Sequence, residues 1–488
     1  MPVTSRKLRF EMRCVVAFRP SLYLSAALVS LVALSGTAFA ESLQEALASA
    51  YANNPSLNAE RAGMRATDEY VPQALANYRP TVTGTISAGI NASDTRAHLP
   101  AYSAWGSSYT DTGALKGEIV IIQPLYAGGR IENGVNKAES AVKAAREMLR
   151  NKEQTTLLDG VSAYMSVILT SQVLELRQSN VAFLQEQVRA ANDRFSVGEG
   201  TRTDVSQAEA ALAAATSLVS VAQADLLTAK ANYIQVIGHD PKGLHSPGPV
   251  TKLLPSKLSV AVDASRKEHP YILAAVHNAD TAAFNVAIQE GALLPSLGLQ
   301  GSVGTTFATI SQSGSSTSPA ADRSRSFDGA IGLQLTIPIY QGGGEYASVR
   351  QAKEQLGQAQ LQTDAARAGV DAALAQAWSA HESAKAQIIA AEAAVKASQL
   401  ALDGVIEEQK VGQRTTLDVL NAQSTLIQAK LSNVQAEAQL VVASYSVVAA
   451  MGRLDRERLS LKVAAYKPEQ HYQQVRDKWV GLRTPDGR

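Results

Sequence analysis

Two short polar stretches contain the residues best suited to specific chemistry. Each places an arginine, a threonine and an aspartate within a turn or so of a Val-Gly dipeptide: Arg202, Thr203 and Asp204, and then Arg414, Thr415 and Asp418. Arginine can make charge-assisted hydrogen bonds to the side-chain oxygens of aspartate and threonine. Such bonds would hold neighbouring helix tips together. Alternatively, threonine and aspartate cap a helix that restarts there. Capping does not explain an arginine at the positive end of a helix in both stretches.

The two stretches are copies of one another. Residues 197–213 read VGEGTRTDVSQAEAALA, and residues 411–427 read VGQRTTLDVLNAQSTLI. Gly198 and Gly412 lie 214 residues apart, as do Asp204 and Asp418. Similar pairs run through the chain at offsets of 214 or 215, including Arg79-Pro80 with Leu294-Pro295, and Pro124 with Pro338. A period this long indicates a gene duplication rather than a solenoid.

Other constellations for catalysis or metal binding are missing from the sequence. Gly128-Gly129-Arg130 and Gly342-Gly343-Gly344 lack the spacing of a phosphate loop, so we interpret them as flexible strand-to-helix junctions. Neither G-x-S-x-G nor H-E-x-x-H occurs, and the seven histidines are scattered. We therefore expect no enzyme, no cofactor and no metal site.

The N-terminus has the pattern of a secretory signal peptide. Five basic residues precede an apolar run from Leu22 to Leu34, and Ala38-Phe39-Ala40 offers a cleavage site. We expect cleavage after Ala40, with Met12 as a possible true start. The only cysteine, Cys14, would be removed. No later stretch is expected to be a transmembrane helix, so any crossing of a membrane must use strands. The net charge of +1 gives no reason to expect a nucleic-acid partner.

Each half of the mature chain predicts the same order of elements: helix, strand, loop, strand, very long helix, turn, long helix. The very long helices should cover about residues 129–195 and 343–409, on the order of 100 Å each at 1.5 Å per residue. The helix after each turn carries a heptad row, beginning at Val205 and at Val419. The second copy has another row beginning at Leu417, and two rows on one helix indicate neighbours on both sides, as in a tube of helices.

The predicted strands alternate apolar and polar residues over about 10–14 residues, enough to cross a bilayer at a tilt. Polar segments such as 311–318 are expected to be exposed loops. The alternative to membrane-spanning strands is a periplasmic β-sandwich with one solvent-exposed face. Four strands cannot close a barrel, and an open edge is not tolerated in lipid. The strands of several chains must therefore combine into one barrel. Two chains would supply eight strands and three would supply twelve, and the sequence pattern does not distinguish these two cases.

These patterns suggest four segments. Residues 1–40 form the signal peptide, 41–254 the first structural repeat, 255–453 the second, and 454–488 a C-terminal periplasmic tail. The tail is of mixed charge, and it either packs outside the helical layer or is partly disordered.

The chain resembles the TolC-type outer-membrane channel family from Leu43 to about Gly452. The resemblance rests on the duplicated element order, on QPLYAGGR and IPIYQGGG, and on VGEGTRTDVSQAEA and VGQRTTLDVLNAQ. It implies an α+β membrane protein: a homotrimer whose twelve-strand transmembrane β-barrel continues into a twelve-helix periplasmic α-barrel. GTRTDVSQAEA and KPEQHYQQVRDKW look most like members associated with type I secretion.

The resemblance also implies a gate at the hairpin tips. Arg414 matches the family's gating arginine, while Thr203 and Asp204 match its partners on the other hairpin. Asp418 matches a carboxylate that forms a ring at the constriction. The sequence departs twice: Asn421 replaces the second ring carboxylate, and Gln409 replaces a tyrosine that binds the opposite aspartate.

The function implied is a passive exit duct of a tripartite efflux or type I secretion system in the outer membrane. Its expected partners are outer-membrane lipid, a periplasmic membrane-fusion adaptor docking around Gly198 and Gly412, and an inner-membrane ABC or RND-type pump. The alternatives are a periplasmic coiled-coil adaptor or structural protein, which would not need four bilayer-length strands, and an ordinary porin, which would not need the helices.

Overall fold

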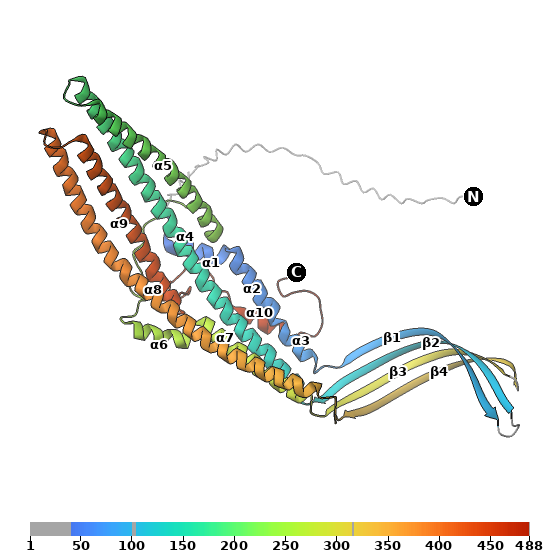
Figure 1. Ribbon diagram of the computed structural model, residues 1–488. Helices are drawn as coiled ribbons and strands as arrows, with labels where there is room; N and C mark the ends of the chain where they lie inside the picture. The colour runs from blue at the N-terminus through green and yellow to red at the C-terminus, as the bar shows by residue number, and fades with distance from the viewer. Residues whose placement is uncertain (1–40, 100–103, 315–316, 488) are drawn as a thin grey trace, which may run out of the picture. The chain divides into compact units, whose positions relative to one another are not determined.

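A computed structural model describes residues 41–99, 104–314 and 317–487 of the chain. The expected signal peptide and its cleavage site lie outside these residues. Ten helices and four strands follow one another in the described part (Figure 1): α1 Leu43–Asn53, α2 Pro55–Asp68, α3 Tyr70–Ala76, β1 Thr81–Leu99, β2 Ala104–Ala127, α4 Arg130–Ser196, α5 Arg202–Ile237, α6 Leu258–Glu268, α7 Pro270–Gly291, β3 Ser296–Gly314, β4 Thr317–Thr336, α8 Gly344–Lys410, α9 Thr416–Ala450 and α10 Pro468–Val475.

The two very long helices have the predicted positions. Helices α4 and α8 are each 67 residues long, and each begins one residue after the expected start. Helix α5 folds back along α4 and helix α9 along α8, giving two helical hairpins that lie side by side through α4 and α9 (Figure 1). Two strands, a very long helix and a second long helix follow in the same order in both halves, although three helices precede β1 and two precede β3. The structure therefore has the duplicated architecture expected from the repeat.

The heptad rows form the packed faces of the hairpins. In α5 the buried alanines recur every seven residues: Ala208, Ala215, Ala222 and Ala229. In α9 both rows contribute buried residues, among them Val419 and Leu426 from one and Leu420, Ile427 and Leu431 from the other. The two rows of α9 serve different neighbours, because this helix packs on α8 on one side and on α4 on the other. Small side chains in these rows allow close approach of the helices.

The main hydrophobic core lies beside the middle of the helical hairpins. It gathers residues of α1, α2 and α4 with the ends of α5 and α9, and its largest fully buried side chains include Tyr164 and Tyr233. The C-terminal tail joins this core through Leu454, Leu459 and Leu461, and helix α10 packs against α2. The tail therefore packs on the outside of the helical layer, one of the two arrangements expected for it.

The four strands form one antiparallel sheet in the order β1-β2-β3-β4. They have 19 to 24 residues, so the predicted length of 10–14 was too short. Residues 311–314 and 317–318 were wrongly expected to be loop, because Gln312 pairs with Ala320 and Gly314 with Thr317; residues 315–316 of that predicted loop lie outside the described residues. Gly, Ser and Thr gave that stretch the composition of a loop, whereas ladder pairing with the neighbouring strand makes it strand. Strand β4 ends at Thr336, so the apolar residues Ile337 and Ile339 lie beyond its end.

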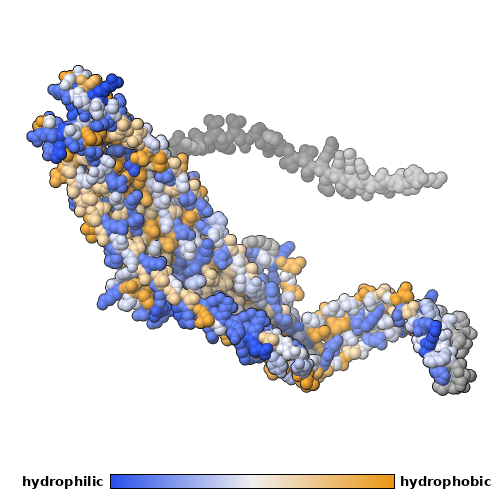
Figure 2. All heavy atoms as spheres, in the orientation of Figure 1, coloured by the Kyte–Doolittle hydropathy of each residue, from blue (hydrophilic) through white to orange (hydrophobic). Residues whose placement is uncertain are grey.

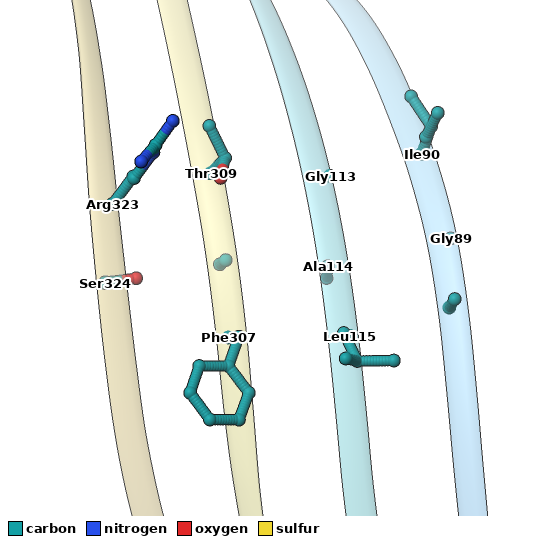
Figure 3. Close-up of a pocket in the computed structure, with 11 residues that line it drawn as sticks. Gly89, Ile90, Gly113, Ala114, Leu115, Phe307, Thr309, Arg323 and Ser324 are labelled. Atoms are coloured by element: carbon teal, nitrogen blue, oxygen red, sulfur yellow. The ribbon is translucent and has the colours of Figure 1, made fainter. Parts of the chain in front are cut away.

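The register aligns one apolar face across the whole sheet. Val82, Ile121, Gly301 and Ile331 form one cross-strand row, and Ile86, Gly117, Thr305 and Phe327 form another. Ile86 is 86% exposed, Ile90 is 88% exposed and Ile331 is 81% exposed. The opposite face carries mostly small and polar residues. A shallow hollow of about 760 Å³ lies across all four strands. Figure 3 shows Ile90, Leu115, Phe307 and Arg323 among the residues that line it.

By length and composition alone, α4 and α5 each contain a window apolar enough to cross a membrane, which the sequence interpretation did not register. Packed helices outside membranes pass the same test, so one or two such windows are weak grounds for a membrane span. In the described chain, 44% of the α4 window and 11% of the α5 window are buried.

Candidate functional site at the hairpin tips

Each hairpin turns by the same local mechanism. After α4, Gly198 has a φ of +81°, and the backbone N–H groups of Gly198 and Glu199 donate to the carbonyls of Phe195 and Arg194. After α8, Gly412 has a φ of +78°, with equivalent bonds from Gly412 and Gln413 to Gln409 and Glu408. These paired bonds form a Schellman motif, in which glycine takes the left-handed position without steric cost. The Val-Gly dipeptides of the sequence are therefore helix ends.

Both aspartates of the tips belong to capping boxes. Asp204 donates its backbone N–H to the Thr201 hydroxyl at 3.2 Å, and its Oδ2 accepts the Thr201 backbone N–H at 3.0 Å. Asp418 and Thr415 repeat these contacts at 3.2 Å and 2.9 Å. Capping satisfies N–H groups that have no partner within the helix. The capping interpretation therefore holds for Asp204 and Asp418 within one chain.

The caps also change the acidity of the two aspartates. Hydrogen bonds from the Thr201 hydroxyl and backbone lower the pKa of Asp204. Hydrogen bonds from the Thr415 backbone and hydroxyl lower the pKa of Asp418. A carboxylate that accepts such bonds is favoured in its charged form. Both tips therefore carry a fixed negative charge at neutral pH.

Arg414 contacts a residue that sequence reasoning missed. Its Nε donates to Glu408 Oε2 at 2.7 Å, and this bond raises the pKa of Arg414. Glu408 lies in the last turn of α8, so the ion pair closes within one hairpin. Thr203 and Asp204, the partners implied by the resemblance, lie on the other hairpin, and the structure gives Asp204 its bonds with Thr201 instead. A latch between these residues and Arg414 remains a prediction.

The two departures from the family pattern also lie at the second tip. Gln409 donates from Nε2 to the Thr416 hydroxyl at 3.4 Å, inside its own hairpin. Asn421 is exposed on α9, one turn after Asp418. Figure 2 shows many hydrophilic residues gathered at both tips.

A direct link between the hairpins lies within the helices, a few turns away from the tips. Gln423 of α9 donates to Asn180 of α4, Nε2 to Oδ1, at 2.9 Å. Beside it, Leu420 is buried in a cluster that otherwise belongs to the first hairpin, with Leu184, Ala191, Val205 and Ala208. The sequence signal was weak: Leu420 belongs to the second heptad row, but nothing marked Gln423 or Asn180 as partners. The two hairpins are thus joined to each other a few turns away from their tips.

Charged and polar side chains are gathered at the tips. Within the described ranges, no group of three or more His, Cys, Asp or Glu side chains is placed to hold a metal ion. The arrangement provides charged and polar side chains at the ends of two long helical hairpins, and such groups can bind other tips, partner proteins or cations.

Comparisons with known proteins agree with this architecture. A family model described as outer membrane efflux protein matches residues 46–239 and 261–453, one segment in each repeat. Outer membrane efflux protein BepC of Brucella suis biovar 1 (strain 1330) is 45% identical, covering 96% of this chain and 98% of that protein. Outer membrane protein TolC of Escherichia coli (strain K12) is 25% identical, covering 90% of this chain and 88% of that protein.

A solved structure extends the similarity to three dimensions. The Campylobacter jejuni CmeC outer membrane channel superposes with a TM-score of 0.71 at 16% sequence identity, and the match covers 89% of each chain. At that identity, the likeness speaks for the fold alone.

Proposed function

The chain belongs to the outer membrane efflux protein family, and we propose that it is the exit duct of a tripartite efflux or type I secretion system. It resides in the outer membrane, as its relatives do. In this proposal it conducts drugs, toxic compounds or secreted proteins passively from the periplasm to the exterior. Members of this family are channels rather than enzymes, and the proposal assigns no chemical step to the protein.

The apolar face of the sheet carries the proposal. Val82, Ile86, Ile90, Phe327 and Ile331 are largely exposed on a single face in the described chain. Exposure of so many large apolar residues on one face marks an interaction surface. In β1 the apolar alternation runs from Val82 to Ile90, about the length at which a tilted strand crosses the hydrocarbon layer. The more polar second half of β1 then extends beyond the bilayer.

The edges of the sheet argue for several copies. Strands β1 and β4 each have one side without a partner strand in the described chain. Lipid does not tolerate unpaired backbone groups, so β4 of one copy must pair with β1 of the next. We propose a homotrimer, which gives twelve strands and room for a channel. The helices support the same closure, because the outer helices α5 and α8 expose apolar side chains: Leu218, Val221, Leu227, Leu361, Ile389 and Leu400.

The gate is proposed at the tips of the resulting twelve-helix tunnel. Arg414 would bind Thr203 and Asp204 of a neighbouring hairpin, Gln409 would assist, and three copies of Asp418 would form a cation-binding ring. Asn421 would make this ring weaker than one with two carboxylates per chain. The observation that supports this placement is the charge of the tips, fixed by the capping boxes and by the exposed Arg414.

Energy and substrates would come from partner proteins. A periplasmic membrane-fusion adaptor would dock on the tips around Gly198 and Gly412 and connect the duct to an inner-membrane ABC or RND-type transporter. The proposed segments remain a signal peptide at 1–40, repeats at 41–254 and 255–453, and a periplasmic tail at 454–488. A periplasmic coiled-coil adaptor, the alternative function, leaves the exposed apolar face of the sheet unexplained.

A pair of matched substitutions tests the membrane-spanning role of the sheet. Ile86→Lys places a charge on the apolar face, and Thr85→Lys places it on the opposite face of the same strand. Lysine facing lipid near the bilayer midplane costs about 2–4 kcal/mol. We expect Ile86→Lys to reduce the trimer recovered from the outer membrane and Thr85→Lys to leave recovery close to the parent. Equal recovery of both variants would contradict the proposal.

The transported compounds are tested in a deletion strain. Loss of the protein should increase sensitivity to drugs or detergents, or remove proteins from the culture medium. Complementation by the parent chain, but not by Ile86→Lys, would tie the phenotype to the membrane duct. A strain without any change in drug sensitivity or in its secreted proteins would count against both forms of the function.

A further inference from the structure

The last described segment of the tail exposes large apolar side chains. Trp479 is 67% exposed and Val480 is 86% exposed, and Leu482 is fully accessible. They follow α10, whose Val475 is buried in the helical region. Three such residues within four positions form an exposed apolar segment at the surface of an outer-membrane protein. The contacts of this segment with Arg79 show which part of the molecule lies beside it.

The structure fixes this segment at the base of the sheet. The Arg79 guanidinium lies over the Trp479 ring, 4.5 Å from the ring centroid, and Arg79 Nη1 donates to the Lys478 carbonyl at 3.0 Å. Strand β1 begins two residues after Arg79, at Thr81. In Figure 1 the tail forms an open loop between α10 and the C-terminus. The exposed apolar segment therefore lies where β1 enters the sheet, although 400 residues separate Trp479 from Arg79 in the sequence.

The other aromatic residues of this level are tyrosines at the same strand ends. Tyr78 precedes β1, and its carbonyl accepts a hydrogen bond from Gln123 of β2 at 2.8 Å. Tyr126 pairs with Leu297 at the beginning of β3, and both tyrosines are about half exposed. Tryptophan and tyrosine are enriched where membrane proteins meet the headgroup layer. Trp479 thus extends a row of interfacial aromatics.

Basic residues flank the apolar segment and suit a phospholipid surface. Arg79, Lys478 and Arg483 surround Trp479, Val480 and Leu482, and the Lys478 ammonium donates to the Arg483 carbonyl, which closes the segment into a turn. Asp477 and Asp486 partly offset this charge. Arg476 binds Glu139 of α4 at 3.5 Å, so the turn is tied to the helical region on its other side.

We propose that residues 478–483 form an interfacial anchor that inserts Trp479, Val480 and Leu482 into the headgroup layer of the inner leaflet of the outer membrane. Long basic side chains extend towards phosphates while apolar neighbours enter the acyl boundary. The occupant is phospholipid, because the segment is pinned beside the strands that the proposed function places in the bilayer. The inference rests on that function in this respect. The anchor would fix the depth at which the barrel meets its periplasmic helices.

Tryptophan fluorescence tests the anchor in the full chain. Trp105→Phe and Trp378→Phe leave Trp479 as the only tryptophan, since the chain has three. The trimer is reconstituted into phosphatidylethanolamine and phosphatidylglycerol vesicles, with or without lipids brominated near the headgroup end of the acyl chain. We expect Trp479 emission to shift to the blue on transfer from detergent and to fall at least about twofold with brominated lipid, as for an interfacial aromatic side chain.

Two further variants separate the segment from general effects of mutation. Val480→Ser with Leu482→Ser should remove most of the quenching in the Trp479-only background. Val197→Ser with Val411→Ser, at two tip valines that are each 70% exposed, should leave it unchanged. If the Trp479-only chain does not assemble, Val480→Cys labelled with an environment-sensitive dye replaces it, because Cys14 is the only native cysteine.

The outcomes distinguish the anchor from the channel. Protein that floats with the vesicles and conducts ions, but whose Trp479 is not quenched, would overturn the anchor and leave the function intact. Emission that is already blue in detergent and insensitive to brominated lipid would assign the segment to a contact between copies and also overturn the anchor. Protein that neither floats nor conducts would overturn both proposals.

Discussion

At the scale of single residues, the tips combine two tasks in the same side chains. Asp204 and Asp418 complete capping boxes within their own hairpins, in which Thr201 and Thr415 are the N-cap residues. Replacing an N-cap residue costs roughly 1 kcal/mol. Both caps use the Oδ2 atom, so Oδ1 of each carboxylate lies outside the box. A capping role therefore does not prevent these residues from binding a partner across the tunnel. The sequence suggested both roles, and only the capping contacts can be seen in one chain.

Arg414 gives the first prediction about the gate. We expect Arg414→Ser or Asp204→Ala to raise single-channel conductance in planar bilayers severalfold, because each removes one side of the proposed link between tips. Glu408→Gln is the control, since it breaks only the ion pair inside the hairpin and leaves Arg414 free to reach a neighbour. Unchanged conductance in both of the first two variants would reduce Arg414 and Asp204 to local roles.

Asp418 gives a prediction about cations and pH. Divalent or trivalent cations in the periplasmic compartment should block the channel, and Asp418→Ala should weaken this block about tenfold or more, because the ring loses its only carboxylates. In the single chain, hydrogen bonds from Thr415 lower the pKa of Asp418, whereas three like charges close together in a ring would raise it. Block should be present at neutral pH and be lost as the pH falls and the carboxylates become protonated. Undiminished block in Asp418→Ala would remove it from the ring.

At the scale of elements, the repeat predicted nearly all of the helical architecture. The starts of α4 and α8 could be located within a residue from the Gly-Gly junctions, and their ends from the Val-Gly breaks, because these signals act locally. Strand ends could not, because Asn91–Leu99 and Ser311–Gly314 look like loop by composition and become strand only through pairing with a distant segment. For the same reason, the Arg414–Glu408 pair and the Gln423–Asn180 link were not predictable from motifs.

Two glycines of α8 and its turn test the local account of the tips. Gly412 and Gly404 both have open space where a Cβ would be, but only Gly412 has a positive φ. Gly404→Ala should stabilise helix α8 by about 0.5–1 kcal/mol. Gly412→Ala should destabilise the tip by about 1 kcal/mol, because alanine is strained in the left-handed region. Hydrogen exchange of the tip amides measures both effects, and equal protection in the two variants would contradict the Schellman account.

At the scale of the whole molecule, the duplication allows the strand pairing between copies to be predicted from the pairing within one chain. Strand β1 pairs with β2 through Thr81 and Ile122, and β3 pairs with β4 through Ser296 and Thr336. Ser296 lies 215 residues after Thr81, and Thr336 lies 214 residues after Ile122, so the two hairpins have the same register. The seam between β2 and β3 should then have a counterpart between β4 of one copy and β1 of the next.

The repeat offsets predict which residues of β4 and β1 face each other between neighbouring copies. In the seam between β2 and β3, Ile119 pairs with Val303. Moving Ile119 forward by 214 residues gives Leu333, and moving Val303 back by 215 residues gives Ala88. Cβ atoms of directly opposed strand residues lie about 4.5–5.5 Å apart, close enough for a disulfide after minor adjustment. We therefore expect Leu333→Cys with Ala88→Cys to cross-link neighbouring copies under mild oxidation.

The size of the cross-linked product then counts the copies in the barrel. A closed ring of three should give bands of one, two and three chains on a denaturing gel, with none larger. Leu333→Cys with Ser87→Cys is the control, because residue 87 points to the opposite face of β1 and should cross-link poorly. A ladder that stops at two chains would require an eight-strand barrel without room for a duct. Efficient cross-linking of the control pair would show that the seam does not inherit the register of the repeat.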